Sequence, residues 1–128
     1  MARVRNSFLD RMLAQDRPGR SRAPAPQDSP ALQSIWEVVC TIPRGQVSTY
    51  GTVARVAGLP GRARLAGRAL RLAPDGMNLP WHRVVGAGGR ISFPPSTAAY
   101  REQARRLRAE GVAVTNGRVD PRAMADFG

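Results

Sequence analysis

Trp81 and His82 stand side by side in the segment LPWHRVVG, which spans residues 79–86. His82 is the only histidine of the chain, and near neutral pH a histidine can serve as a general base or activate a nucleophile. The segment contains no cysteine, serine or threonine for His82 to activate. An indole offers an N–H donor and a π face but no comparably nucleophilic lone pair, so the segment indicates binding rather than covalent catalysis.

Cys40 is the only cysteine of the chain. A single cysteine excludes an internal disulfide framework and any metal site built from several cysteines. With one histidine and scattered acidic residues, we expect no bound metal and no cofactor. Cys40 follows an apolar helical stripe and has no evident base nearby, so we expect a buried, inert thiol rather than a reactive one.

Positive charge is the strongest feature of the composition. The 128 residues carry 20 basic and 9 acidic side chains, which gives a formal net charge of +11, and every basic residue is arginine. The planar guanidinium matches phosphates and base edges and stacks on bases. A GC-rich genome would explain the choice of arginine over lysine but not the excess of positive charge. The composition therefore predicts a polyanionic partner, of which nucleic acid is the natural one.

The chain reads as one folded domain with peripheral ends. The segment RPGRSRAPAPQDSP predicts a linker, so residues 1–28 are expected to form a flexible N-terminal extension. The domain is expected over residues 29–121, with residues 122–128 as a loose C-terminal tail. No run has the length of a membrane span and no signal-peptide core is present, so we expect a cytoplasmic protein, associated with the nucleoid if the source is bacterial, with no membrane partner.

The first helix is predicted within SPALQSIWEVVCTIP, residues 29–43. Ser29 suits the N-cap, Pro30 suits the first helical position, and Pro43 ends the helix. An apolar stripe at helical spacing is expected to face the core, formed by Leu32, Ile35, Trp36 and Val39.

Two short helices are predicted next, in the arrangement of a helix-turn-helix. Ser48 or Thr49 caps the first, which runs to Ala57, and Gly58 ends it. The expected inner face of this helix is formed by Val53, Val56 and Ala57. The second helix runs from about Arg62 to Leu72, with small or apolar residues on one side (Ala63, Ala66, Gly67, Leu70) and an arginine stripe on another (Arg64, Arg68, Arg71). Small residues beside arginine would let this helix approach a phosphate-lined groove; a solvated basic face on a packing helix is the alternative.

The remaining residues predict two hairpins and a helix. Val84–Val85 and Arg90–Ile91 flank the turn GAGG. Ser96 or Thr97 caps a helix that Gly111 ends, with an inner face of Ala99, Gln103 and Leu107. Asn116–Gly117 suits a type I′ turn. The predicted fold class is mainly α, a winged helix-turn-helix-like domain with short β-hairpins.

Four segments in order and spacing resemble the DNA-binding and active-site domain of O6-alkylguanine-DNA alkyltransferases. They are IPRGQVSTYG, GLPGRARLAGRALR, LPWHRVVGAGG and LRAEGV, within residues 30–115. In those enzymes the third motif reads Pro-Cys-His-Arg and its cysteine accepts the alkyl group, whereas Trp81 stands there in this chain. Tryptophan at this position is similar to the alkyltransferase-like proteins, which bind O6-alkylguanine in DNA without repairing it and pass the lesion to nucleotide excision repair. The resemblance implies a monomeric, non-enzymatic damage sensor whose partners are duplex DNA with O6-alkylguanine and excision-repair proteins.

The resemblance also implies roles for individual residues. Arg64 matches the arginine that fills the gap left by a flipped base, with a phosphate contact as the alternative. Tyr50 matches the tyrosine beside the flipped nucleotide, with a buried helix-capping role as the alternative. The small residues of the second helix match those that let a recognition helix lie in the minor groove. The residues implicated in DNA or lesion binding are Tyr50, Ala63, Arg64, Ala66, Gly67, Arg68, Trp81, His82, Arg83 and Val84.

Four of these residues belong to the segment around the expected lesion pocket. Trp81 is expected to form a pocket wall, with a core tryptophan as the alternative. His82 is expected to hydrogen-bond the helix-turn-helix, with a contact to the flipped base as the alternative. Arg83 and Val84 match the segment that supports the pocket, with the backbone of Val84 facing the base.

Two departures from the family pattern carry consequences. Ala73-Pro74 replaces a bracing Asn-Pro, so the turn that holds Trp81 must be secured differently. The expected lid, SFPPSTAA, contains Pro94 and Pro95, which have no N–H to donate to O6. We therefore expect recognition by shape and apolar contact, with tolerance of large alkyl groups.

Two other function classes remain open from the sequence. A residual alkyltransferase, or a glycosylase using the same pocket, would gain mass or release a base. A winged-helix transcription regulator would prefer particular sequences of undamaged DNA.

Overall fold

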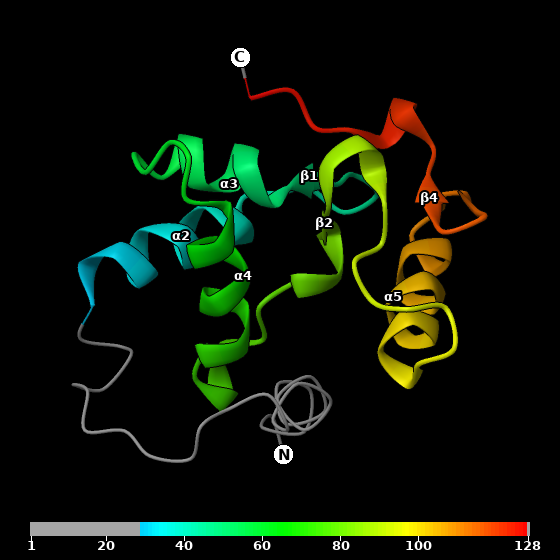
Figure 1. Cartoon of the computed structure of the whole chain (residues 1–128), viewed down its shortest axis with the longest axis horizontal. Helices are drawn as coiled ribbons and strands as arrows, with labels where there is room; N and C mark the ends of the chain where they lie inside the picture. Colours follow the sequence, from blue (N-terminus) through cyan, green and yellow to red (C-terminus); the bar gives the residue numbers. More distant parts are fainter. Residues whose placement is uncertain (1–28, 128) are drawn as a thin grey trace.

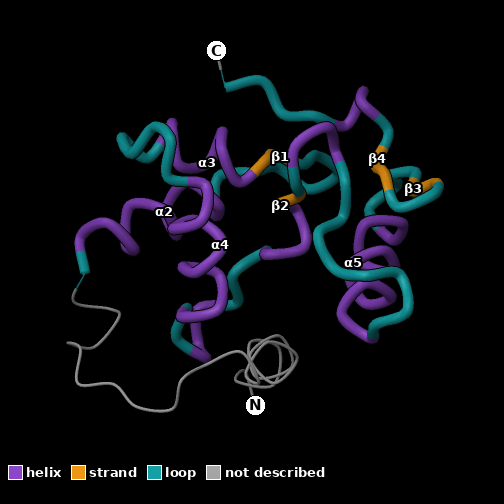
Figure 2. Tube along the Cα trace, in the orientation of Figure 1, coloured by secondary structure: helices purple, strands orange, loops and turns teal. Residues whose placement is uncertain are grey.

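The computed structural model describes residues 29–127. Figure 1 shows the helices drawn in cyan and green gathered on one side, the helix drawn in orange on the other, and the strands labelled β1 (Ser48–Thr49) and β2 (Val84–Val85) between them. The helices are α2 (Pro30–Cys40), α3 (Tyr50–Val56), α4 (Ala63–Leu72) and α5 (Ala98–Ala109). Figure 2 shows how short the strands are: β1 (Ser48–Thr49), β2 (Val84–Val85), β3 (Val114–Thr115) and β4 (Arg118–Val119). Single 3-10 turns lie between them at η3 (Asp75–Met77), η4 (Trp81–Arg83), η5 (Ala87–Gly89) and η6 (Pro121–Ala123). The predicted mainly helical class is confirmed.

Helix α2 begins as its sequence predicts. The Ser29 hydroxyl accepts a hydrogen bond from the backbone N–H of Leu32 at 3.2 Å, and Pro30 occupies the first helical position. The predicted stripe is buried, so this face of α2 forms one wall of the core: Leu32, Ile35, Trp36 and Val39.

Cys40 differs from its prediction because its side chain is exposed. It is the last residue of α2 and comes directly after the buried Val39, which places it outside the inward stripe. It lies beside a shallow hollow formed with Gln33, Trp36, Glu37 and Met77. Partial burial raises the pKa of the Cys40 thiol, which disfavours the reactive thiolate.

Helices α3 and α4 form the predicted helix-turn-helix. Thr49 caps α3 by accepting a hydrogen bond from the Thr52 N–H at 3.1 Å, and Gly58 follows the helix with a φ of +86°. One part of the prediction was wrong, because Val56 is 39% exposed. In this seven-residue helix, Ala54 points inward with Val53 instead.

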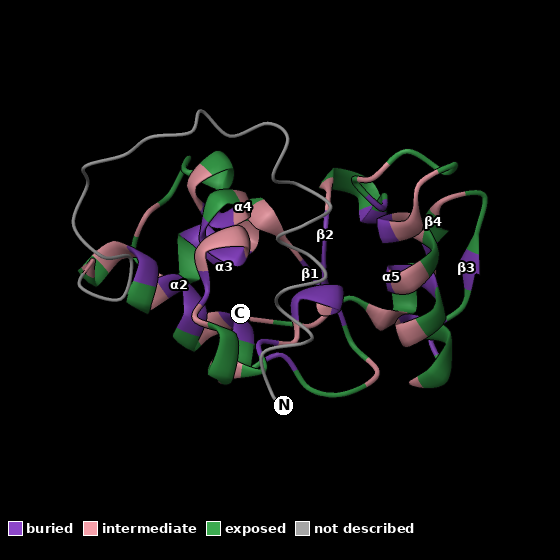
Figure 3. Cartoon of the chain, turned by 90° about the horizontal axis from the view of Figure 1, so that it is seen from below, coloured by how far each residue is buried: buried purple, intermediate pink, exposed green. Residues whose placement is uncertain are grey.

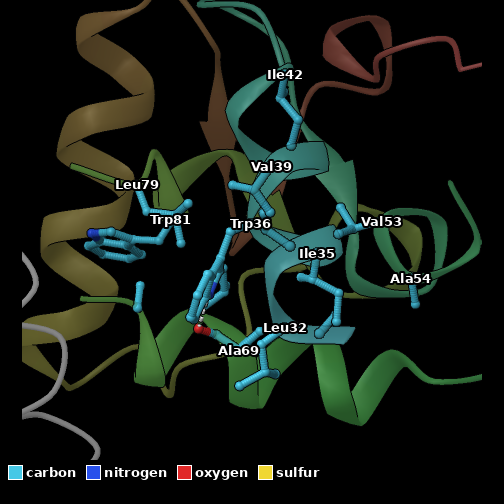
Figure 4. Close-up of a cluster of buried hydrophobic side chains, with 14 residues drawn as sticks. Leu32, Ile35, Trp36, Val39, Ile42, Val53, Ala54, Ala69, Leu79 and Trp81 are labelled. Carbon is cyan, nitrogen blue, oxygen red and sulfur yellow. Dashed lines mark hydrogen bonds between the residues drawn. The ribbon is translucent and has the colours of Figure 1, made fainter. Parts of the chain in front are cut away.

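A side-chain hydrogen bond anchors α4 to α2. The indole Nε1 of Trp36 donates to the carbonyl oxygen of Ala69 at 2.7 Å, drawn as a dashed line in Figure 4. The inward side of α4 is formed by Ala66, Ala69 and Leu70. Helices α2, α3 and α4 thus enclose the first of two hydrophobic clusters.

Strand β2 corrects the predicted hairpin around GAGG. It pairs in parallel with β1, with Ser48 opposite Val84. The Gly86 N–H does bond to the Arg90 carbonyl at 2.7 Å and closes the turn, but Arg90 bridges to Arg118 instead of continuing a hairpin. Both residues of β2 are buried, as Figure 3 shows, and a strand buried on both faces can join a parallel pair.

Helix α5 and the second hairpin enclose the second hydrophobic cluster. Thr97 caps α5 by accepting a hydrogen bond from the Tyr100 N–H, and the predicted inner face of Ala99, Gln103 and Leu107 is buried. Strands β3 and β4 are antiparallel. Their turn has positive φ at both Asn116 and Gly117, as a type I′ turn requires.

The C-terminal tail is docked rather than loose up to residue 127. The Val47 N–H donates to the Ala123 carbonyl at 2.9 Å, and the Ala125 N–H donates to the Val47 carbonyl at 2.7 Å. Phe127 packs against the first hydrophobic cluster. The expected N-terminal extension, residues 1–28, lies outside the described residues. Within residues 29–127, no helix combines the length and apolar character needed to cross a membrane.

Candidate functional site

An open groove of about 960 Å³ lies between α4 and the loop that follows η5. Six of the ten predicted site residues line it together: Tyr50, Ala63, Arg64, Gly67, Arg68 and Trp81. The expected lid contributes Ser92, Phe93 and Pro94. Segments far apart in the sequence therefore meet at one concave surface.

The other four predicted site residues lie behind this surface. Ala66 is buried in the helical core, and Val84 is buried in β2. His82 and Arg83 belong to η4, directly after Trp81, but neither lines the groove. The carbonyl oxygen of Val84 already accepts a hydrogen bond from Gln103, so the predicted contact of the Val84 backbone with a base stays untested.

The α4 side of the groove is strongly basic. Arg64 and Arg68 are exposed one turn apart, and Arg62 and Arg71 also line the groove. No acidic side chain within residues 29–127 forms an ion pair with Arg64 or Arg68. Cations presented without carboxylate partners along a concave surface fit a phosphate backbone.

Trp81 forms an apolar part of the groove although it is only 1% exposed. Phe93 meets its ring edge-on, with centroids 6.2 Å apart and an interplanar angle of 82°. On its own element, His82 makes a similar edge contact at 6.3 Å. Figure 4 shows Trp81 at the margin of the helical core, with α5 beside it. The indole Nε1 of Trp81 has no hydrogen-bond partner among the described residues.

Arg106 is a contact of Trp81 that the sequence did not predict. Its guanidinium carbon lies over the indole, 5.3 Å from the ring centroid. Arg106 belongs to α5, and the spacing of α5 residues gives no signal that one of them reaches a tryptophan in η4.

Tyr50 connects the helix-turn-helix with the lid. Burial raises the pKa of Tyr50, and a side-chain hydrogen bond with Ser92 of the lid opposes that shift. A methyl group on Gly67 would lie 3.8 Å from two carbons of the Tyr50 ring. The Tyr50 ring therefore lies close to α4 at position 67, at the distance of an ordinary packing contact.

His82 is held by α5 and not, as predicted, by the helix-turn-helix. Its Nε2 lies 2.7 Å from Oε2 of Glu110, directly after α5. Arg83 donates to the same carboxylate at 2.8 Å and to the Ile42 carbonyl at 2.9 Å. The prediction failed because Glu110 is the acidic group that the fold brings next to His82, which the local sequence cannot indicate.

The pKa shifts of His82 and Glu110 favour a neutral imidazole that faces an ionised carboxylate. Burial lowers the pKa of His82, and the hydrogen bond that His82 makes to Glu110 only partly opposes the shift. Burial would raise the pKa of Glu110, but hydrogen bonds from Arg83, the Gly45 backbone and His82 outweigh it and lower the pKa to about 2. Neutral His82 then donates its Nε2–H to Glu110, so the pair fixes the orientation of η4.

The turn that precedes Trp81 is secured by backbone contacts, where Ala73-Pro74 offers no side-chain amide. The Met77 N–H bonds to the Pro74 carbonyl at 3.0 Å, and Asn78 then adopts a left-handed conformation with φ 55°. Leu79 is buried, and the Trp81 N–H bonds to the Leu79 carbonyl at 2.8 Å.

The groove contains no cysteine, since Cys40 lies at the separate hollow on α2. Across residues 29–127, no cluster of three or more His, Cys, Asp or Glu side chains is placed to hold a metal ion. The groove therefore offers cationic, aromatic and apolar contacts.

Comparisons with known proteins agree with this geometry. Residues 30–112 match the family model described as 6-O-methylguanine DNA methyltransferase, DNA binding domain. A DNA base-flipping protein of Escherichia coli K12 is 46% identical over 89 residues, which cover 69% of this chain and 67% of that protein. A methylated-DNA–protein-cysteine methyltransferase of Mycobacterium leprae is 41% identical over 59 residues, but the match covers only 36% of that enzyme.

A solved structure is similar over most of the described residues. The crystal structure of Schizosaccharomyces pombe Atl1 in complex with DNA containing O6-carboxymethylguanine matches with a TM-score of 0.64 and 35% identity. The match covers 75% of this chain and 94% of that one. With this similarity in sequence and in fold, the chain belongs to the alkyltransferase-like family.

Proposed function

We propose that this protein binds O6-alkylguanine in duplex DNA, holds the damaged base flipped into the groove, and leaves its alkyl group in place. The observation that carries the proposal is that Trp81 lines the groove. It belongs to the segment that resembles the Pro-Cys-His-Arg motif of alkyltransferases, and we infer that it stands in place of their acceptor cysteine. The basic surface of α4 beside it supports DNA as the ligand. Relatives named for base flipping and for binding damaged DNA support the same reading.

In the proposed complex, α4 lies in the minor groove. Its small residues, Ala63 and Gly67, permit close approach of the helix backbone, while Arg68 contacts phosphate. Arg64 fills the gap left by the flipped base and pairs with the orphaned cytosine. The minor groove presents a degenerate pattern of donors and acceptors, which suits a protein that must ignore sequence.

Selectivity then arises in two steps. Extruding a base costs a few kcal/mol, and less where pairing is already weakened. Alkylation at O6 removes the N1 proton of guanine and weakens its pair with cytosine, so the damaged base flips more easily. Apolar and stacking contacts with Trp81 and Phe93 then hold it, at about 1–3 kcal/mol for each stacked base.

We propose that no alkyl transfer follows. Transfer requires a soft nucleophile, and a thiolate beside a histidine is the form that alkyltransferases use. His82 instead donates to Glu110, and Cys40 is at the other hollow with a raised pKa. The bound complex would then be passed to nucleotide excision repair proteins, with this chain acting as a monomer.

The test compares binding to two duplexes that differ only in one O6-methylguanine. Wild type should bind the damaged duplex at least tenfold more tightly, and Arg64→Ala and Trp81→Ala should reduce that preference. Mass spectrometry after incubation separates a sensor from an enzyme: a gain of one alkyl group on the protein, or a released base, would contradict the proposal. Strong preference for one undamaged sequence would favour a transcription regulator instead.

A further inference from the structure

Arg106 and Glu102 form an ion pair on α5, and the guanidinium of this pair lies over Trp81. The Arg106 guanidinium lies 5.3 Å from the indole centroid, and its side chain is only 20% exposed. Glu102, one turn earlier on α5, accepts a hydrogen bond from Arg106 Nε at 2.5 Å. The guanidinium is thus held by a carboxylate while its central carbon lies over the aromatic ring.

Glu102 is well suited to fix this cation. Its side chain is 21% exposed, and its pKa is lowered, first by a hydrogen bond from Arg105 and also by Arg106. The carboxylate therefore stays ionised at neutral pH. Arg105 donates to both oxygens of the same carboxylate, but it is itself 67% exposed and has no contact with Trp81 among the described residues.

We propose that Arg106 is a positioning residue for lesion binding: held by Glu102, its guanidinium fixes the orientation of Trp81 against the groove. The inference rests on the proposed function, because it assigns the selectivity of that same groove to a residue on α5. No site residue predicted from the sequence lies on this helix.

The physical reason is that Trp81 is held by packing in the core, with no directional bond from its own side chain to fix the orientation of the ring. Its Nε1 makes no hydrogen bond with the described residues, and its two aromatic neighbours, His82 and Phe93, meet it by edge contacts. A cation over an indole face is attracted by the ring quadrupole, and the attraction grows when the pair is shielded from water. With Arg106 over the ring, a flipped base can contact only the part of the indole that lines the groove.

The variants change the cation while keeping the stem of the side chain. Arg106→Met removes the charge, Arg106→Lys keeps a cation near the ring, and Glu102→Gln weakens the anchor. Arg105→Met is the matched control, because it removes one positive charge from the same helix and the same carboxylate without touching Trp81. Each variant is measured against an O6-methylguanine duplex and an unmodified duplex.

A second readout follows Trp81 directly. Trp36 is the only other tryptophan, so the emission of Trp81 is obtained by subtracting the spectrum of the same variant carrying Trp81→Phe. Arg106→Met should change this emission, Arg106→Lys should restore it in large part, and Arg105→Met should leave it as in wild type. Circular dichroism melts show whether each variant is folded.

The expected result is a loss of about tenfold in the ratio of damaged to undamaged affinity for Arg106→Met, with partial recovery for Arg106→Lys. Affinity for unmodified DNA should fall equally in Arg106→Met and Arg105→Met. If Arg106→Met keeps the wild-type ratio and the wild-type Trp81 emission, as Arg105→Met is expected to do, the role of Arg106 is disproved while the proposed function stands. If wild type itself shows no preference for the damaged duplex, the proposed function fails and this inference fails with it.

Discussion

Gln103 donates a hydrogen bond from its side-chain Nε2 to the carbonyl oxygen of Val84, 2.9 Å away. The same nitrogen donates to the His82 carbonyl at 3.0 Å. One buried amide on α5 therefore satisfies two carbonyls of the segment that follows Trp81, and it couples α5 to the parallel strand pair.

Replacing this amide should destabilise the whole domain. Gln103→Leu leaves two buried carbonyls without a donor, and we expect a loss of about 2–3 kcal/mol in the free energy of unfolding. Urea unfolding followed by circular dichroism measures it. Arg105→Leu, on the exposed side of the same helix, is the control and should change stability little. Equal stabilities of the two variants would contradict the proposed importance of the bond.

Glu110 predicts a specific loss of stability in acid. Its pKa in the folded protein is about 2, below the ordinary 4.5, so the unfolded chain binds the proton more readily between these values. Its contribution, on the order of 3 kcal/mol, is present above about pH 4.5 and is lost as the pH falls toward 2. His82 acts in the same direction: its pKa is lowered by burial, so stability begins to fall below about pH 6.5.

Unfolding in urea at several pH values tests this dependence. Wild type should begin to lose stability below about pH 6.5 and lose it most steeply between about pH 4.5 and pH 2. Glu110→Gln should be less stable at neutral pH and show a flatter profile. An unchanged profile in Glu110→Gln would show that other carboxylates govern acid unfolding.

Trp36 should be important for stability and not for lesion recognition. Trp36→Phe leaves the buried Ala69 carbonyl without its 2.7 Å donor, and we expect a loss of about 2 kcal/mol. Thermal and urea unfolding measure the change. The ratio of damaged to undamaged affinity should stay at the wild-type value in conditions where the variant is folded, and a selective loss of that ratio would refute the assignment.

Binding to undamaged DNA should depend steeply on salt. Each phosphate neutralised contributes about −0.9 to the slope of log K against log salt concentration. Arg68→Ala should therefore reduce the magnitude of the slope by about one unit. Arg122→Ala is the control, because Arg122 in η6 pairs with Asp120, the residue before that turn, and does not line the groove. A slope that Arg68→Ala leaves unchanged would argue against α4 as the phosphate-contacting surface.

The size of the alkyl group should matter little for affinity. The lid contributes Phe93 and Pro94 to the groove, and proline has no N–H with which to select the O6 atom. Duplexes with O6-methylguanine and O6-benzylguanine should bind with affinities within about tenfold of each other, or more tightly for benzyl. Strong preference for methyl, measured by fluorescence anisotropy, would contradict recognition by shape and apolar contact.

The elements predicted correctly from the sequence are those with local physical signals. Ser29 and Thr97 cap helices through bonds to N–H groups three residues away, and Asn116–Gly117 form the turn that their conformational freedom favours. The arginine stripe of α4 also followed from helical spacing, whereas the position of Trp81 at the groove followed from the resemblance to the alkyltransferase motif. These features depend on neighbours in the chain, which a single sequence contains.

The features that the sequence did not reveal depend on distant partners. The pairing of β1 with β2 joins two-residue strands that carry no periodicity, and Val47 binds the C-terminal tail through backbone hydrogen bonds. The contact of Arg106 with Trp81 and that of His82 with Glu110 need the placement of α5, which helix periodicity does not give. Val56 and Cys40 were predicted to be buried from their side-chain types. An apolar or thiol side chain does not by itself determine which side of a helix faces the core.

The parallel pairing of Ser48 with Val84 has a consequence for engineering this scaffold. Tyr50 comes directly after β1, and Trp81 begins the 3-10 turn that precedes β2. The pairing of these short strands therefore fixes the positions of the two aromatic rings relative to each other at the groove. The loop between α3 and α4 can change length without altering the pairing of the two strands. A one-residue insertion between Thr49 and Tyr50, or between Trp81 and Val84, would turn one ring away from the other, and redesign of the surface should leave these two junctions intact.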